Sequence, residues 1–96
     1  MKIPVWHPSI TEAEHSAVRR VLELGYLGMG SDVFDFERSV AEILNVPEEA
    51  VVSTHTGQSA LHLALLAVGV GPDDIVITPS FNNVADFQAI QACGAK

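Results

Sequence analysis

The sequence predicts an α/β fold with an incomplete, mostly parallel sheet and flanking helices, and two observations carry this prediction. Short β-branched segments alternate with longer segments of helical periodicity in the second half of the chain. A strand, a helix and another strand also follow one another within about thirty residues, the length of a βαβ unit with parallel pairing. Two strands alone would leave open edges and bare apolar faces, so we expect further sequence to complete the sheet.

Residues 1–10 are expected to form an extended arm that leads into a first helix. Thr11 and Glu14 have the spacing of a capping box, in which each side chain bonds the other residue's backbone N–H. Gly25 is expected to end this helix, because glycine readily takes the left-handed conformation of a C-cap. Apolar residues between these ends recur at steps of three and four and predict one helical stripe: Ala17, Val18, Val21 and Leu22.

A second helix completes the segment 11–47. Ser31 or Asp32 is the expected N-cap, after a glycine-spaced turn, and the helix is expected to stop near Asn45. Its apolar stripe consists of Val33, Phe36, Val40, Ile43 and Leu44.

Residues 50–94 are expected to form a βαβα unit. The predicted strands are the β-branched runs at 50–54 and 75–78. The helix between them begins at Gly57, and we expect it to be buried because it is apolar on almost every face. A last helix over 84–93 would be closed by a glycine.

Composition excludes several classes of function. The formal charge is −7, so the basic surface that nucleic acid requires is missing. No leader or membrane-spanning run of apolar residues stands out, which predicts a cytoplasmic protein without a membrane partner. Hydrophobic residues make up 48% of a chain of only 96 residues, which favours a fragment or an obligate oligomer.

The histidines do not predict a metal site. No carboxylate or cysteine stands at zinc-ligand spacing around His55 and His62. His62, on the apolar helix, is interpreted as a packed core residue. We therefore expect no bound metal.

An anion site is predicted where the first strand turns into the buried helix. The first N–H groups of a helix have no internal partners, and Gly57 would let a phosphate approach the main chain. Gln58 and Ser59 would add side-chain donors. The alternative is that Gly57 permits a tight turn and Ser59 caps the helix, and composition leaves both readings open.

Three segments carry a resemblance to a known family. Residues 31–41 are similar to G-P-x-V-x-x-F-E-x-x-(F/L)-A, with Phe36 and Glu37 at the F-E pair. Residues 51–65 resemble S-G-T-x-A-L-H-L-A-L, and the stretch from 71 to 96 resembles G-P-G-D-E-V-I-V-P followed by an N-A-I and G-A-K pattern. In this order, over nearly the whole chain, these motifs resemble the DegT/DnrJ/EryC1/StrS family of sugar aminotransferases.

The resemblance implies the amino-terminal part of the large domain of a fold type I enzyme that depends on pyridoxal 5'-phosphate. The coenzyme phosphate would rest on Gly57, Gln58 and Ser59. Family members form homodimers and move an amino group, commonly from glutamate, to a keto group on a nucleotide-linked sugar for polysaccharide or natural-product biosynthesis. Their coenzyme-binding lysine would lie beyond Lys96, so the resemblance implies no catalytic residue in this chain and no turnover by it alone.

Two departures from the family pattern fall at positions that face the coenzyme. Gln58 replaces a threonine, and Asn83 stands where an aromatic residue stacks on the coenzyme ring. Asn83 is either a coenzyme contact or the N-cap of the helix that begins at Val84. Two alternatives to the aminotransferase remain: a sugar dehydratase of the same family, with histidine in place of the lysine, or a non-catalytic α/β module, which these departures favour.

Overall fold

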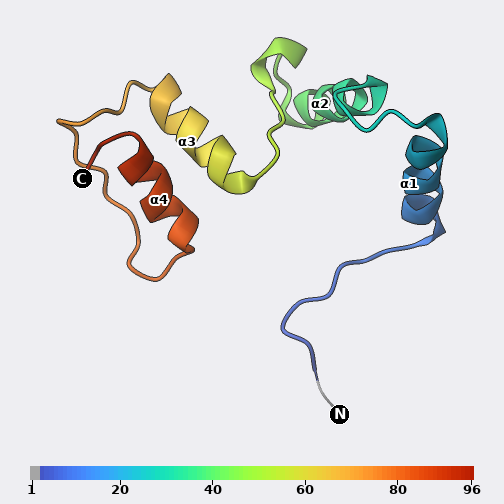
Figure 1. The fold of residues 1–96 in the computed structure, drawn as a ribbon, viewed down its shortest axis with the longest axis horizontal. Helices are drawn as coiled ribbons and strands as arrows, with labels where there is room; N and C mark the ends of the chain where they lie inside the picture. The colour runs from blue at the N-terminus through green and yellow to red at the C-terminus, as the bar shows by residue number, and fades with distance from the viewer. Residues whose placement is uncertain (1–2) are drawn as a thin grey trace.

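Four α-helices and one short 3-10 helix are present in the computed structural model, which describes residues 3–96. Their bounds are α1 Glu12–Leu24, α2 Ser31–Leu44, η1 Glu48–Ala50, α3 Gly57–Ala67 and α4 Val84–Ala92. Figure 1 shows α3 and α4 side by side, whereas α1 and α2 lie apart from them along the chain. No helix in this described part combines the length and apolar character needed to cross a bilayer.

The residues before α1 have no regular secondary structure from position 3 onward, and the first two positions of the predicted arm lie outside the described residues. The capping box that begins α1 is confirmed. The backbone N–H of Thr11 donates to Glu14 Oε2 at 2.6 Å, and Ala13 N–H donates to Thr11 Oγ1 at 3.3 Å. Thr11 Oγ1 also donates to Glu14 Oε2 at 2.5 Å, and this side-chain bond, followed by the backbone bond from Thr11, lowers the pKa of Glu14. Gly25 ends the helix at φ 70°, as predicted.

The start of α2 differs from the prediction. Gly30 is the N-cap, without a side-chain cap bond, and Ser31 is already helical. Asp32 accepts instead from the Arg20 guanidinium of α1, so its carboxylate joins two helices rather than capping one. The predicted end is confirmed, because Asn45 takes a left-handed conformation with φ 53° and closes the helix.

The predicted α/β fold is wrong for this chain: residues 3–96 contain helices and no strand. The first predicted strand, 50–54, begins inside η1, and neither 51–54 nor 75–78 has regular secondary structure or bonds to the other run. Around the second run, the backbone bonds are Val76 N–H to Lys96 O at 2.8 Å and Lys96 N–H to Asp74 O at 3.0 Å. β-branched residues favour an extended backbone, but a β-strand also needs a neighbouring strand with which to form a hydrogen-bond ladder.

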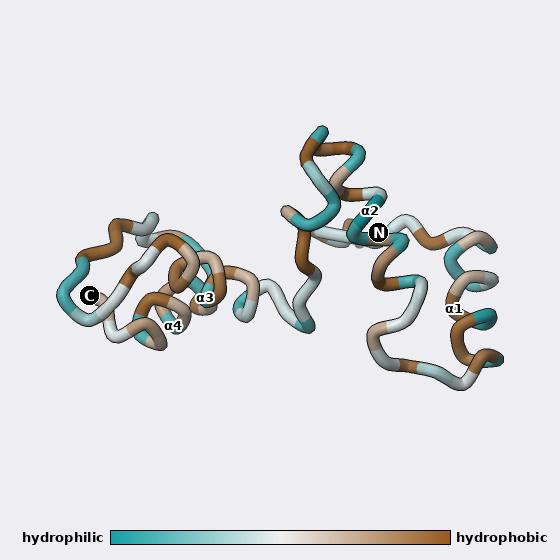
Figure 2. The backbone as a smooth tube through the Cα atoms, turned by 90° about the horizontal axis from the view of Figure 1, so that it is seen from above, coloured by the Kyte–Doolittle hydropathy of each residue, from teal (hydrophilic) through white to brown (hydrophobic). Residues whose placement is uncertain are grey.

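The predicted burial of α3 is also wrong, since none of its residues is buried. The core of the described chain is small, and its buried apolar residues are Ala41, Ala89, Ile90, Cys93 and Ala95. The radius of gyration is 17.6 Å, whereas a compact chain of this length is expected to have about 13 Å. Figure 2 shows the same open arrangement, with apolar segments along the whole tube. Helix α3 packs on α4 alone, so its other faces remain exposed.

Helix α2 is joined to the segment that leads into α3 by one buried carboxylate. Glu37 is 9% exposed, and its Oε1 accepts both the backbone N–H and the hydroxyl of Ser53, each at 2.7 Å. The bonds from the backbone and then the side chain of Ser53 lower the pKa of Glu37. The ionised carboxylate therefore stabilises this connection.

We predict that the chain of 96 residues, produced alone, unfolds without a sharp cooperative transition. Its core is too small to offset the conformational entropy of so many ordered residues. Thermal unfolding followed by circular dichroism should give a broad curve, and the dye ANS should fluoresce strongly on the exposed apolar surface. A steep two-state transition with little dye binding would contradict this prediction.

A second prediction follows from the lowered pKa of Glu37. Because the folded-state pKa lies below the ordinary value of 4.5, the stabilisation is fully present above that value and is lost as the pH falls through the lowered pKa. In the protein expressed from its complete reading frame, Glu37→Gln should lower the melting temperature at neutral pH. The difference from the unmutated protein should shrink as the pH is lowered below 4.5. A difference that is constant between pH 7 and pH 3 would show that ionisation of Glu37 plays no part.

Candidate functional site

The amino-terminal end of α3 lies where the sequence predicted it. Thr56 is the N-cap, with φ −151° and ψ 155°, and Gly57 is the first helical residue. Gly57, Gln58 and Ser59 therefore form the first turn of the helix. The partial positive charge of the helix dipole is concentrated in such a turn.

Capping determines which backbone donors remain open at this end. Thr56 Oγ1 accepts from Ser59 N–H at 3.1 Å, and Thr56 O accepts from Ala60 N–H at 3.1 Å. Within residues 3–96, no protein acceptor is found for the N–H groups of Gly57 and Gln58. The first turn thus has two open backbone donors, and the backbone of Ser59 is already bonded.

Gly57 is required neither by its own backbone nor by packing. It is absent from the residues with positive φ, so the turn does not need a left-handed conformation there. A Cβ added to Gly57 would meet nothing within 4 Å. The interpretation that this glycine only permits a tight turn therefore lacks a physical cause in the structure.

A groove of about 670 Å³ brings the amino-terminal ends of α3 and α4 together. Three of the four predicted site residues, Gly57, Gln58 and Asn83, line it. The rest of the lining is Ala60, Leu61, Ala64, Ala85 and Asp86. Residues 26 positions apart in the sequence, such as Gly57 and Asn83, therefore share one concave surface.

Asn83 is the N-cap of α4, which was one of its two predicted interpretations. Its Oδ1 accepts from Ala85 N–H at 2.9 Å, so the carbonyl end of the side chain is engaged. The Nδ2 group remains as a donor beside the groove. Capping and a ligand contact are therefore compatible at Asn83, and the contact itself stays a prediction.

Asp86 is the acidic residue of this groove, and Asn82 holds it. Asn82 Nδ2 donates to the Asp86 carboxylate, and Asn82 Oδ1 accepts from Asn83 N–H at 2.8 Å. These bonds fix the start of α4 and engage the carboxylate locally.

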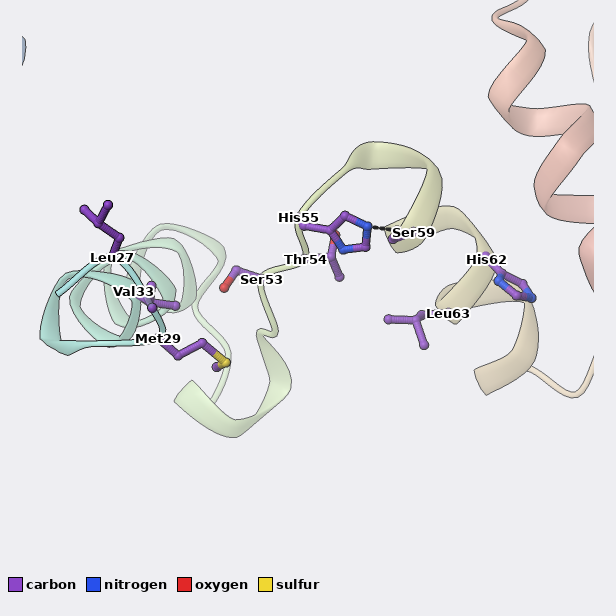
Figure 3. A pocket seen from close by; sticks show the side chains of 10 residues that line it. Leu27, Met29, Val33, Ser53, Thr54, His55, Ser59, His62 and Leu63 are labelled. Carbon is purple, nitrogen blue, oxygen red and sulfur yellow. Dashed lines mark hydrogen bonds between the residues drawn. The ribbon is translucent and has the colours of Figure 1, made fainter. Parts of the chain in front are cut away.

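Ser59, the fourth predicted residue, faces a different cavity. This cavity has a volume of about 830 Å³, and Figure 3 shows Leu27, Met29 and Val33 on one side of it and the side chains of α3 on the other. Ser59 Oγ lies 3.2 Å from His55 Nε2 and 3.0 Å from Thr56 Oγ1. Its side chain thus belongs to a local cluster with His55 and Thr56.

Sequence reasoning missed the roles of His55 and Thr56. The available signal was position: Thr56 directly precedes the first helical residue, and His55 stands four positions before Ser59. His62 is half-buried and lines the same cavity. In residues 3–96 no group of three or more His, Cys, Asp or Glu side chains is arranged to hold a metal ion.

Known proteins resemble this chain along almost its whole length. It is 35% identical over 94 residues to the UDP-4-amino-4-deoxy-L-arabinose--oxoglutarate aminotransferase of Shewanella sediminis, covering 98% of this chain and 24% of that protein. It is 37% identical over 94 residues to the GDP-perosamine synthase of Vibrio cholerae, covering 97% of this chain and 25% of that protein. The chain therefore spans about a quarter of the length of these relatives.

A solved structure is similar to this chain in both sequence and backbone arrangement. The crystal structure of an aminotransferase TlmJ from Streptoalloteichus hindustanus superposes with a TM-score of 0.88 at 42% identity, over 99% of this chain and 26% of that one. The sequence profile of the DegT/DnrJ/EryC1/StrS aminotransferase family matches residues 8–96. On this evidence the chain belongs to the DegT/DnrJ/EryC1/StrS aminotransferase family.

Proposed function

We propose that the protein to which this chain belongs is an aminotransferase that depends on pyridoxal 5'-phosphate and aminates a nucleotide-linked keto sugar. The observation that carries the proposal is the pair of open backbone donors at Gly57 and Gln58, in the first turn of α3, in a chain of this family. Backbone N–H groups in a first helical turn bind phosphate because they are unpaired and the helix dipole favours negative charge.

The residues of the groove fit the phosphate end of the coenzyme. Gly57 leaves open space in front of its backbone, so an anion could approach the N–H groups without meeting a side chain. Gln58 adds an amide donor, and Asn83 offers Nδ2 from the start of α4. Bound there, pyridoxal phosphate would supply the electron sink for amino-group transfer, while these residues would hold and orient it.

Asn83 changes one feature of this proposed site. An amide has no aromatic face, so ring stacking at position 83 would be replaced by a hydrogen bond from Nδ2. Because Oδ1 already caps α4, Asn83 can meet the coenzyme only as a donor. The departure is therefore compatible with coenzyme binding and does not by itself favour a non-catalytic module.

The relatives support the substrate class. One is named as an oxoglutarate aminotransferase of a UDP-linked amino sugar and another as a GDP-perosamine synthase. Their names favour a nucleotide-linked keto sugar as acceptor and glutamate as amino donor. A cytoplasmic homodimer, active in polysaccharide or natural-product biosynthesis, completes the proposal.

The proposed activity is tested on the protein expressed from its complete reading frame. Added pyridoxal phosphate should give a visible absorbance band, and borohydride should then attach the coenzyme covalently to a lysine, detected by mass spectrometry. Glutamate and a nucleotide-linked keto sugar should yield 2-oxoglutarate and the amino sugar. If the folded protein neither binds the coenzyme nor forms these products, the proposal fails.

Gly57→Ala should separate folding from coenzyme binding. The new methyl group meets open space at a helical φ, so stability should stay equal or rise by about 0.4–1 kcal/mol. The methyl group would stand between the phosphate and the open backbone N–H groups. The affinity for pyridoxal phosphate should therefore fall by about ten-fold or more, since a hydrogen bond to a charged group is worth roughly 1.5–3 kcal/mol. Isothermal titration and thermal unfolding measure the two effects.

Gly25→Ala is the matched control for this variant. Gly25 also has open space around it, but its φ of 70° strains alanine by about 1–2 kcal/mol. This control should lose stability and keep its coenzyme affinity well below the melting temperature. Unchanged coenzyme affinity in Gly57→Ala would remove Gly57 from the proposed site.

A further inference from the structure

A buried carboxylate lies on α2, outside the proposed coenzyme contacts. Among the charged residues of 3–96, Glu37 alone is buried, with 9% of its surface exposed. The ion pairs found in residues 3–96 join Arg20 to Asp32 and Arg38 to Asp35, so neither involves Glu37. Its charge is met by the N–H and the hydroxyl of Ser53, which converge on Oε1.

These bonds fix the start of the segment 53–56, which ends at the N-cap of α3. Thr54 Oγ1 donates to Thr56 O at 2.8 Å, and Thr56 then caps the helix through Ser59 N–H. The segment 53–56 is therefore held by Glu37 at one end and by its own cap at the other. Residues 54–56 alone separate Ser53 from Gly57, the first residue with an open N–H group.

The contact spans 16 positions in the sequence, so it is a tertiary connection rather than a local turn. It joins α2 to a segment that has no strand partner in the described residues. Hydrogen bonds to an ionised acceptor are stronger than neutral ones. A neutral or shorter side chain at position 37 would hold this segment less firmly.

We propose that Glu37 is a positioning residue for the coenzyme phosphate: through Ser53 it fixes the segment that directs the N–H groups of Gly57 and Gln58 into the groove. This inference rests on the proposed function for the identity of the ligand. It assigns a role to a side chain that itself touches neither coenzyme nor substrate.

The test compares pyridoxal phosphate with pyridoxal, which lacks the phosphate. Both are titrated into the protein from its complete reading frame, well below the melting temperature of every variant. Glu37→Gln should weaken binding of pyridoxal phosphate by about ten-fold and leave pyridoxal binding unchanged. Ser53→Ala, which keeps the backbone donor, should show a smaller loss in the same direction. Glu42→Gln, an exposed carboxylate on the same helix, is the matched control and should bind both compounds normally.

Hydrogen exchange of the coenzyme-free protein separates this proposal from the proposed function. In Glu37→Gln, peptides that cover residues 53–60 should exchange faster, while the control should match the unmutated protein. Equal losses for both compounds, or unchanged affinity for pyridoxal phosphate, would overturn the positioning role. If the unmutated protein binds no pyridoxal phosphate, the proposed function fails, and the exchange rates still decide whether Glu37 fixes the segment.

Discussion

The bond between the Glu37 carboxylate and Ser53 is the constraint on which the arrangement of this chain depends. Without paired strands, little else joins the first two helices to the last two: α2 contacts η1, and α3 contacts α4. Glu37 spans the gap between these pairs, with both donors of Ser53 on one oxygen. A buried carboxylate that lost these donors would be left without compensation for its desolvation. The direction in which the chain enters α3 therefore depends on this contact.

Capping side chains determine what the helix ends can bind. At α3, Thr56 takes the N–H of Ser59 and leaves those of Gly57 and Gln58 open. At α4, Asn83 uses its oxygen as a cap and keeps its amide nitrogen beside the same groove. The two helices thus present donors to one surface, whereas Asp86 is held by Asn82. The open donors favour an anionic ligand, whereas the charge of the Asp86 carboxylate in the same groove opposes one.

The backbone of this chain is similar to part of a larger solved protein. The chain superposes over 99% of its length on 26% of a solved aminotransferase chain. Exposure alternates along 75–78: Val76 and Thr78 are half-buried near α4, whereas Ile75 and Ile77 are 80% and 94% exposed. Both isoleucines belong to a long set of exposed large apolar residues in the described chain. The chain therefore superposes on one portion of a larger aminotransferase chain, and many of its large apolar side chains are exposed.

Local signals in the sequence determined most of the helix ends, although not the N-cap of α2, which is Gly30. The capping box at Thr11 and Glu14, the left-handed residues Gly25 and Asn45, and the glycine that opens α3 each act within one helical turn, so their neighbours in the sequence suffice. Strand pairing, the burial of α3 and the position of Asn83 Nδ2 beside the groove depend instead on residues far away in the sequence. Extended backbone without a ladder partner is not a strand, and an apolar helix is buried only where other elements cover it. The same reason applies to two further features, which only the tertiary structure determines. They are the hydrogen bonds from Ser53 to Glu37 and the groove that Gly57 and Asn83 share.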